Sequence, residues 1–270
     1  MIQLLSGDCL EVMKDLSDNS IDCFICDLPY GQLASPKIGG QANERMPSDR
    51  CAWDVKIDLD AFWKEVSRLA RNDNTPVIHF CNTRFGIDLI NSNPKWFRYD
   101  LVWNKERGVS FLLANKQPMK SHEMIYVFSK KASYYKRVDI DDPTKKAHSQ
   151  YYKDISNTTR SGNVYTTSDS KLTLSKGCED GKRCPLSVIN MPKVGTSKDK
   201  HPTEKPVELY KWLLSRYCPN GGTILDPTAG SFNSIRAAQE LGLDAIGIEK
   251  DKTFYDNAVK AFAVSSPNLP

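Results

Sequence analysis

The chain has 270 residues, of which 40% are hydrophobic and 26% charged, so we expect an ordinary soluble globular protein with one large core. No apolar run approaches the roughly 18 residues that span a bilayer, which excludes a membrane-spanning protein. The N-terminus has no basic region and meets Asp8 after a short apolar run, so we expect no signal peptide and a cytoplasmic location. Of the eight cysteines, Cys23 and Cys26 have metal-site spacing but lie in an apolar run, which favours packing over metal binding.

The net charge is only +4, but the basic residues are concentrated in the middle of the chain. Residues 131–200 carry 14 Lys or Arg against 8 Asp or Glu, whereas the remainder carries 23 against 25. A basic segment on a near-neutral body is typical of a protein that grips a phosphate backbone. From charge alone, a solvated surface insertion is an equally good interpretation.

Strands and helices are predicted from hydrophobic periodicity in the first 130 residues. The predicted strands are 2–5, 21–27, 76–81, 97–103 and 123–128, and the predicted helices are 10–16, 59–71 and 85–90. The polar stretch 31–53 is expected to be a long mobile loop that closes over a site or touches DNA. His79, inside a predicted strand, is expected to be packed and hydrogen-bonded rather than catalytic.

The periodic signal fades between residues 130 and 200 and then returns. The predicted helices are 207–217, 232–241 and 253–262, and the predicted strands end at Asp226 and Glu249. Regular alternation of strands and helices predicts an α/β fold with a mostly parallel sheet.

Two motifs follow buried apolar runs, Asp27-Leu28-Pro29-Tyr30-Gly31 and Asp226-Pro227-Thr228-Ala229-Gly230-Ser231. Ligands of open α/β sheets bind at the carboxyl edge, where such strands end. We therefore expect one site built from both halves of the chain.

The tetrad Asp27-Leu28-Pro29-Tyr30 resembles the catalytic motif of DNA amino-methyltransferases, which methylate adenine N6 or cytosine N4 with S-adenosylmethionine. The motif 226–231 resembles their cofactor loop, and 6–10, 201–206 and 246–249 resemble further family motifs. The catalytic motif precedes the cofactor loop, as in the permuted β-class. The resemblance implies a three-layer, doubly wound, Rossmann-like class I methyltransferase. It also implies a catalytic half at 1–130, a target-recognition insertion at 131–200, a cofactor-binding half at 201–265 and a tail at 266–270.

The resemblance assigns roles to individual residues. The Asp27 carboxylate and the Leu28 carbonyl would accept the two N–H bonds of the target amino group, and Tyr30, after Pro29, would stack on the flipped base. Glu249 would hold the ribose hydroxyls of S-adenosylmethionine. The cofactor's remaining expected contacts are Asp226, Thr228, Ala229, Gly230 and Ser231 for the methionine part, Thr203 and Lys205 for its carboxylate, and Asp8 and Cys9 for the adenine side. No metal is expected.

Two positions depart from the family pattern. Leu28 stands where proline is usual, and Phe232 stands where the cofactor loop usually has a glycine that permits positive φ. Asp27 at the head of the tetrad favours adenine N6 in duplex DNA. The alternatives are an N4-cytosine enzyme, a methyltransferase acting on RNA or a protein amide, and an inactive DNA-binding protein of the same fold. A homodimer and a restriction endonuclease partner stay open.

Overall fold

The computed structural model describes residues 1–31, 37–38, 41–42, 54–109, 111–144, 181–194 and 204–265. The chain forms two compact units, a body of Met1–Lys136 with Ser187–Pro270, and a second unit, Arg137–Leu186. Most of the expected loop 31–53, most of the expected recognition region 131–200, and the tail lie outside the described residues. The expected functional division of the chain therefore stays a prediction.

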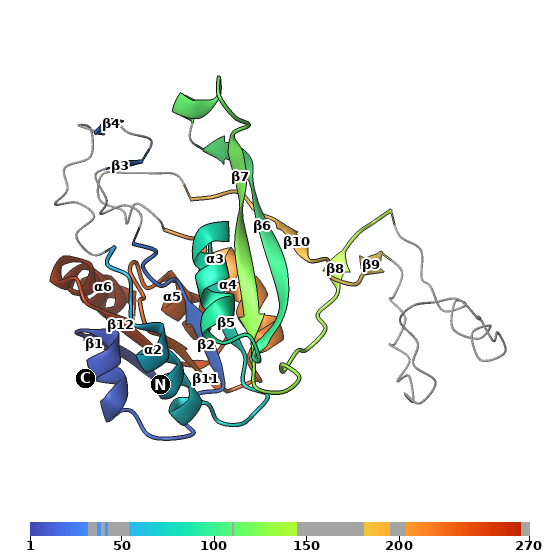
Figure 1. The fold of residues 1–270 in the computed structure, drawn as a ribbon. Helices are drawn as coiled ribbons and strands as arrows, with labels where there is room; N and C mark the ends of the chain where they lie inside the picture. Colours follow the sequence, from blue (N-terminus) through green and yellow to red (C-terminus); the bar gives the residue numbers. More distant parts are fainter. Residues whose placement is uncertain are drawn as a thin grey trace. The chain divides into compact units, whose positions relative to one another are not determined.

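An eight-stranded sheet in the order β1-β12-β11-β2-β5-β7-β6-β10 forms the centre of the body (Figure 1). Its strands are β1 Ile2–Ser6, β2 Cys23–Cys26, β5 Val77–Cys81, β6 Phe97–Val109, β7 Lys120–Phe128, β10 Val188–Asn190, β11 Thr223–Asp226 and β12 Asp244–Glu249. Neighbours run parallel except at β7, which is antiparallel to both β5 and β6. The carboxyl ends of β1, β2, β5, β11 and β12 therefore meet at one edge.

Helices cover both faces of this sheet. They are α1 Cys9–Val12 with the 3₁₀ turn η1 Met13–Asp15, α2 Leu59–Leu69, α3 Thr83–Ser92, α4 Val207–Tyr217, α5 Asn233–Glu240 and α6 Lys252–Ser265. One core cluster joins α4, α5 and α6 to the sheet, and the other joins α1, α2 and α3 to its opposite face. This confirms the three-layer, mostly parallel α/β fold expected from the sequence.

The strand β2 shows why the sheet core is apolar on both sides. Cys23 and Ile25 belong to the cluster with α4 and α5, whereas Phe24 and Cys26 belong to the cluster with α2 and α3. All four side chains are fully buried. A strand buried on both faces reads as a continuous apolar run. Because Cys23 and Cys26 point to opposite faces, the two thiols cannot bind one metal ion together.

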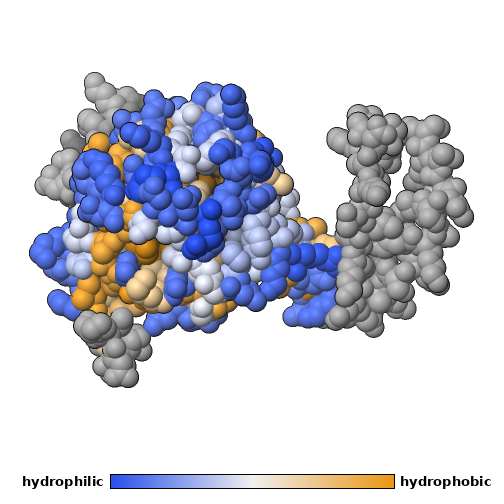
Figure 2. All heavy atoms as spheres, turned by 90° about the horizontal axis from the view of Figure 1, so that it is seen from below, coloured by the Kyte–Doolittle hydropathy of each residue, from blue (hydrophilic) through white to orange (hydrophobic). Residues whose placement is uncertain are grey.

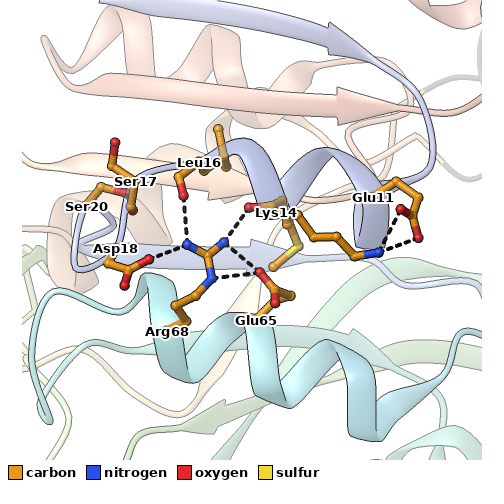
Figure 3. A network of polar contacts seen from close by, with 9 residues as sticks. Glu11, Lys14, Leu16, Ser17, Asp18, Ser20, Glu65 and Arg68 are labelled. Carbon is orange, nitrogen blue, oxygen red and sulfur yellow. Dashed lines mark hydrogen bonds and ion pairs between the residues drawn. The ribbon is translucent and has the colours of Figure 1, made fainter.

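Arg68, near the end of α2, connects α2 to the helical segment formed by α1 and η1 (Figure 3). Its guanidinium donates to the carbonyl oxygens of Met13 and Leu16 at 2.6 and 2.8 Å, and to the Glu65 carboxylate at 2.6 Å. The last carbonyls of a helical segment need donors from outside it. Arg68 supplies them and so fixes the segment that begins at the cavity described below.

Several elements differ from their sequence-based bounds. α3 begins at Thr83 because the Asn82 side chain accepts a hydrogen bond from the Phe85 N–H at 2.9 Å and caps the helix. β6 and β7 continue to Val109 and from Lys120, well beyond the apolar runs that predicted them. The strand β10 was not predicted, since three residues give no periodic signal.

The expectation for His79 was half right. Its side chain is fully buried and packs edge-on against the rings of Phe62, Trp63 and Phe128 at centroid distances of 5.5–5.6 Å. Neither ring nitrogen has a hydrogen-bond partner in the described structure, so the expected hydrogen bonding is wrong. Burial lowers the pKa of His79 to about 3, so the ring is neutral.

The described surface has mixed character. Seen from the end opposite the tip of the β6–β7 hairpin, hydrophilic residues surround a smaller apolar area (Figure 2).

Among the described helices, none combines the length and apolarity that crossing a bilayer requires. Two short antiparallel pairs complete the description, β3 Lys37–Ile38 with β4 Gln41–Ala42, and β8 Ile140–Asp141 with β9 Lys182–Arg183 in the second unit.

Candidate active site

A cavity of about 640 Å³ opens at the carboxyl edge of the sheet in the body. The predicted site residues that line it are Asp8, Cys9, Asp27, Leu28, Pro29, Tyr30, Lys205, Thr228, Ala229, Gly230, Ser231 and Glu249. Thr203 lies outside the described residues, and Asp226 lies behind the wall rather than in it. The two motifs therefore meet in one site, as the sequence predicted, in a volume typical of small-molecule sites.

Asp27 and Lys205 form the central ion pair of this site. The Lys205 ammonium contacts the Asp27 carboxylate directly and also lies 3.6 Å from Glu123. The Lys205 side chain is 3% exposed, and its ammonium stands 4.6 Å from the centroid of the Phe80 ring. The sequence predicted that Lys205 contacts the cofactor's carboxylate, whereas in the structure its ammonium contacts the Asp27 carboxylate.

Glu123, on β7, links several polar groups around Asp27. Its carboxylate forms an ion pair with Lys105 of β6 at 2.7 Å and accepts a hydrogen bond from the Tyr30 hydroxyl at 3.1 Å. The same hydroxyl lies 3.0 Å from the Asp27 carboxylate, so its single proton is shared between the two carboxylates. Two carboxylates and two ammonium groups are thus brought together, so their formal charges balance.

The two carboxyl groups do not titrate alike. Burial raises the pKa of Asp27, and the charge of Glu123 adds to this, while Lys205 opposes it. Burial would also raise the pKa of Glu123, but Lys205 and Lys105 together outweigh it and leave that pKa lowered. The pKa of Lys205 stays raised because Asp27 and Glu123 outweigh the effect of its burial. The ammonium is therefore the main group that favours an ionised Asp27, and the hydrogen bond from Tyr30 acts in the same direction.

Tyr30 and Leu28 are held in place by packing. The Tyr30 ring stacks on Phe85 of α3, with centroids 4.9 Å apart and planes at 27°. The Leu28 side chain is 1% exposed and belongs to the core on the side of α2 and α3. Leu28 stands where the family usually has proline, and burial of the leucine side chain in the core accommodates this difference. After the tetrad, the Gly31 N–H donates to the Asp54 carboxylate at 2.9 Å, which anchors the end of the motif.

Asp226 supports the loop that follows β11. Its carboxylate accepts hydrogen bonds from the Ser234 hydroxyl at 2.5 Å and from the Thr228 N–H at 3.1 Å. The side chain is 2% exposed, and burial raises its pKa to about 7 despite these two donors. Asp226 thus positions the loop Thr228–Ser231, which in turn lines the cavity.

Glu249 closes the same loop from the end of β12. Its carboxylate accepts hydrogen bonds from the Gly230 N–H at 2.8 Å and from the Asp251 N–H at 2.7 Å. Gly230 has φ +51, which a residue without Cβ adopts readily. Both Glu249 oxygens keep further acceptor positions, because an ionised carboxylate has about four. A ligand with neighbouring hydroxyl groups would fit there.

Asp8 and Cys9 line the cavity at the start of α1. The Asp8 carboxylate caps the helix by accepting the Leu10 N–H at 3.0 Å and also contacts the Lys250 ammonium at 3.0 Å. Burial would raise the pKa of Asp8, but Lys250 and the Leu10 N–H outweigh it and lower that pKa. Burial raises the pKa of the Cys9 thiol to about 12, which keeps it neutral.

Phe232 keeps the backbone conformation expected of the glycine it replaces. Its φ is +58, in the left-handed region, at the N-cap of α5. The side chain is fully buried, and a Cβ on Gly247 of β12 would come within 2.8 Å of its ring. The ring therefore packs beneath β12, and Phe232 does not line the cavity.

Sequence reasoning missed Glu123 and Lys105. The only sequence feature that could have indicated them is that each is a charged residue beside an apolar run. Lys105 lies two residues after Trp103, and Glu123 lies just before Met124. Only the register of β6 with β7, which sets Trp103 opposite Glu123, brings the two charges together. Such long-range register cannot be read from one sequence.

Comparison with known proteins finds a matching family model and a related methyltransferase. The family model for N6 and N4 methyltransferases, described as DNA methylase, matches residues 21–260. The type II methyltransferase M.HinfI of Haemophilus influenzae is 27% identical over 275 residues, covering 98% of this chain and 69% of its own.

Solved structures show the same fold at low sequence identity. The complex of M1.HpyAVI with SAM has a TM-score of 0.58 at 21% identity and covers both chains completely. The cytosine-N4-specific PvuII DNA methyltransferase has a TM-score of 0.62 at 12% identity, covering 100% of this chain and 88% of its own. A putative DNA modification methylase of Thermus thermophilus, in complex with S-adenosyl-L-methionine, has a TM-score of 0.56 at 19% identity, covering 100% and 98%.

Proposed function

Since the chain belongs to the N6/N4 family of DNA methylases, we propose that it transfers a methyl group from S-adenosylmethionine to the N6 amino group of adenine at a specific site in duplex DNA. The observation that carries this proposal is the shared cavity. Asp27, Leu28, Pro29 and Tyr30 line it together with the loop Thr228–Ser231 and Glu249. The proposed acceptor groups for an amino nitrogen and the proposed site for the methyl donor therefore share one cavity.

Asp27 suits the role of amino-group acceptor. The exocyclic nitrogen of adenine is a poor nucleophile because its lone pair is delocalised into the ring. Acceptors for its two N–H bonds favour a more tetrahedral nitrogen and direct the lone pair toward the methyl group. The Asp27 carboxylate, favoured in its ionised form by Lys205, and the carbonyl of Leu28 would serve as these acceptors. An aspartate at this position favours adenine over cytosine, by the resemblance of the tetrad.

The residues of the second half of the site fit S-adenosylmethionine. Glu249 offers acceptor positions for ribose hydroxyls, and the small residues Thr228–Ser231 let the backbone approach a ligand. Asp8 and Cys9 line the side expected to face its adenine ring. When bound, the cofactor supplies an activated methyl group on a sulfonium centre. The chain's own residues then position the acceptor nitrogen.

The target adenine would leave the duplex stack to reach Asp27, because a paired base hides its amino group. In the described structure the Tyr30 hydroxyl is engaged with both Asp27 and Glu123. The Tyr30 ring is thereby held beside Asp27, where it would stack on the flipped base. We assign sequence recognition to residues 131–200, on the basis of their charge and polar composition.

The test is incubation of the pure protein with labelled S-adenosylmethionine and mixed-sequence duplex DNA, followed by mass analysis of the nucleosides and mapping of the modified site. We expect N6-methyladenine, with no product from an Asp27→Ala variant that still binds the cofactor. N4-methylcytosine would overturn the adenine proposal and leave the methyltransferase. A protein that neither methylates DNA nor binds S-adenosylmethionine would overturn the whole proposal.

A further inference from the structure

The β6–β7 hairpin projects beyond the rest of the sheet (Figure 1). β6 and β7 pair with each other as far as Val109 and Lys120. In the described part of the chain, β5 pairs with β7 only at 124–128, and β10 pairs with β6 only at 102–104. Residues 106–109 and 111–121, which we call the hairpin tip, therefore extend past both neighbouring strands.

The end of the hairpin tip is apolar and exposed. Phe111 and Leu112, in the short 3₁₀ turn η3 Phe111–Leu113, are 71% and 73% exposed. Leu113 and Met119 are also exposed. Four large apolar side chains at one projecting end are unfavourable in water, and such a patch is typical of an interaction site.

The tip is also basic and borders the active site. Arg107, Lys116 and Lys120 are exposed, whereas Glu106 is its one acidic residue. Val109 and Lys120 line the same cavity as Asp27. An apolar end with cationic flanks, placed beside the pocket for a target base, matches the interior and the phosphates of a DNA duplex.

The base of the tip is closely packed. A Cβ on Gly108 would come within 2.7 Å of the Met119 side chain, so glycine allows the two strands to approach there. The Met119 side chain thus fills the space beside the backbone just below the turn. This packing holds the apolar end of the hairpin tip in a defined position. A segment that inserts between bases needs such support.

We propose that the hairpin tip inserts Phe111 and Leu112 into the base stack beside the target nucleotide, while Arg107 and Lys116 bind the flanking phosphates. This inference rests on the DNA methyltransferase function proposed above. Apolar wedges stabilise unstacked base steps, and a base that is already unpaired needs less help to leave the helix. The tip would therefore stabilise the extruded state of the target base.

The test compares methylation of two duplex oligonucleotides that carry the mapped site. One duplex is fully paired, and the other has an abasic position opposite the target base. The variant is Phe111→Ser with Leu112→Ser. Its controls are the exchange Phe111→Leu with Leu112→Phe, which keeps apolar bulk at the tip, and Val259→Ser on the exposed face of α6.

We expect the double serine variant to lose on the order of 10–100-fold in kcat/KM on the paired duplex, but less than about threefold on the abasic duplex. Both controls should retain activity close to the unmodified protein on each duplex. Equal losses on the two duplexes, or no loss on the paired one, would overturn the proposal. If the modified base is cytosine, the adenine proposal fails while the same comparison at that cytosine still tests the tip.

Discussion

The Lys205 ammonium contacts the Asp27 carboxylate across 178 residues of sequence, and this contact joins the two halves of the active site. Asp27 directly follows β2, whereas Lys205 lies just before α4. The Asn233 side chain donates to the Lys205 carbonyl at 2.8 Å and so fixes the backbone of this lysine to α5. The carboxylate proposed to hold the target amino group thus contacts the half of the chain that carries the loop Thr228–Ser231.

Replacing Lys205 by methionine should make methylation more sensitive to acid. Loss of the ammonium removes the charge that lowers the pKa of Asp27, so burial and Glu123 raise that pKa further. Since the proposed mechanism uses an ionised Asp27 as acceptor, the acid limb of the pH profile of kcat/KM should move to higher pH. Activity at neutral pH should fall about 10–100-fold, as expected when a reacting group is misplaced.

The matched control is Lys211→Met, which removes an ammonium of α4 that pairs with Glu208 and Glu240 outside the cavity. Its pH profile should coincide with that of the unmodified protein. If the Lys205→Met profile also coincides after scaling, the ion pair has no role in the ionisation of Asp27.

Glu123→Gln should shift the same limb in the opposite direction. The neutral amide removes the negative charge that raises the pKa of Asp27, so Asp27 should ionise at lower pH than in the unmodified protein. Gln can still accept the hydrogen bond from the Tyr30 hydroxyl, which limits the structural disturbance. The acid limb measured by kcat/KM should therefore lie below that of the unmodified protein. A shift in the same direction as Lys205→Met would contradict the assigned electrostatics.

The sequence predicted the framework of this site but not its electrostatic partners. The helix Val207–Tyr217 was predicted with its observed bounds, because Pro206 precedes it and its apolar residues recur at helical spacing. The motifs that begin at Asp27 and Asp226 were placed in one site because parallel strands end at one edge. The contact of Lys205 with Asp27, and that of Lys105 with Glu123, depend on long-range packing and register, which local patterns do not contain. The sequence placed Asp226 at the site, but it could not show that this residue lies behind the cavity wall and not in it.

Phe232→Gly should destabilise the protein although it restores the family's usual residue. Glycine would remove the strain of a left-handed backbone at φ +58, which would raise the free energy of unfolding by about 1–2 kcal/mol. Loss of a fully buried phenyl ring in the core beneath β12 would cost about 3–5 kcal/mol. The free energy of unfolding, measured by urea denaturation, should therefore fall by roughly 1–4 kcal/mol.

Affinity for S-adenosylmethionine should change little in this variant under conditions where it stays folded, because Phe232 does not line the cavity. Calorimetric titration of the folded variant measures this directly. A stability equal to that of the unmodified protein would mean that strain at Phe232 matches the value of its packing. A large loss of cofactor affinity would mean that the ring shapes the site.

His79→Leu should reduce the loss of stability in acid. The pKa of His79 is lowered to about 3 in the folded protein, whereas an unfolded histidine titrates near 6.5. The unfolded state therefore binds a proton that the folded state rejects, and the contribution is fully present above pH 6.5. As the pH falls from there toward about 3, the free energy of unfolding should drop by up to about 1.4 kcal/mol per pH unit from this group.

Urea unfolding of both proteins between pH 4 and pH 8 measures this difference. Above pH 7 the leucine variant should be at least as stable, because it removes two buried ring nitrogens that have no hydrogen-bond partner in the described structure. The gap in its favour should widen as the pH falls below 6.5, since carboxyl groups contribute equally to both proteins. Parallel curves would mean that His79 keeps its proton affinity on folding, through a partner such as a buried water molecule.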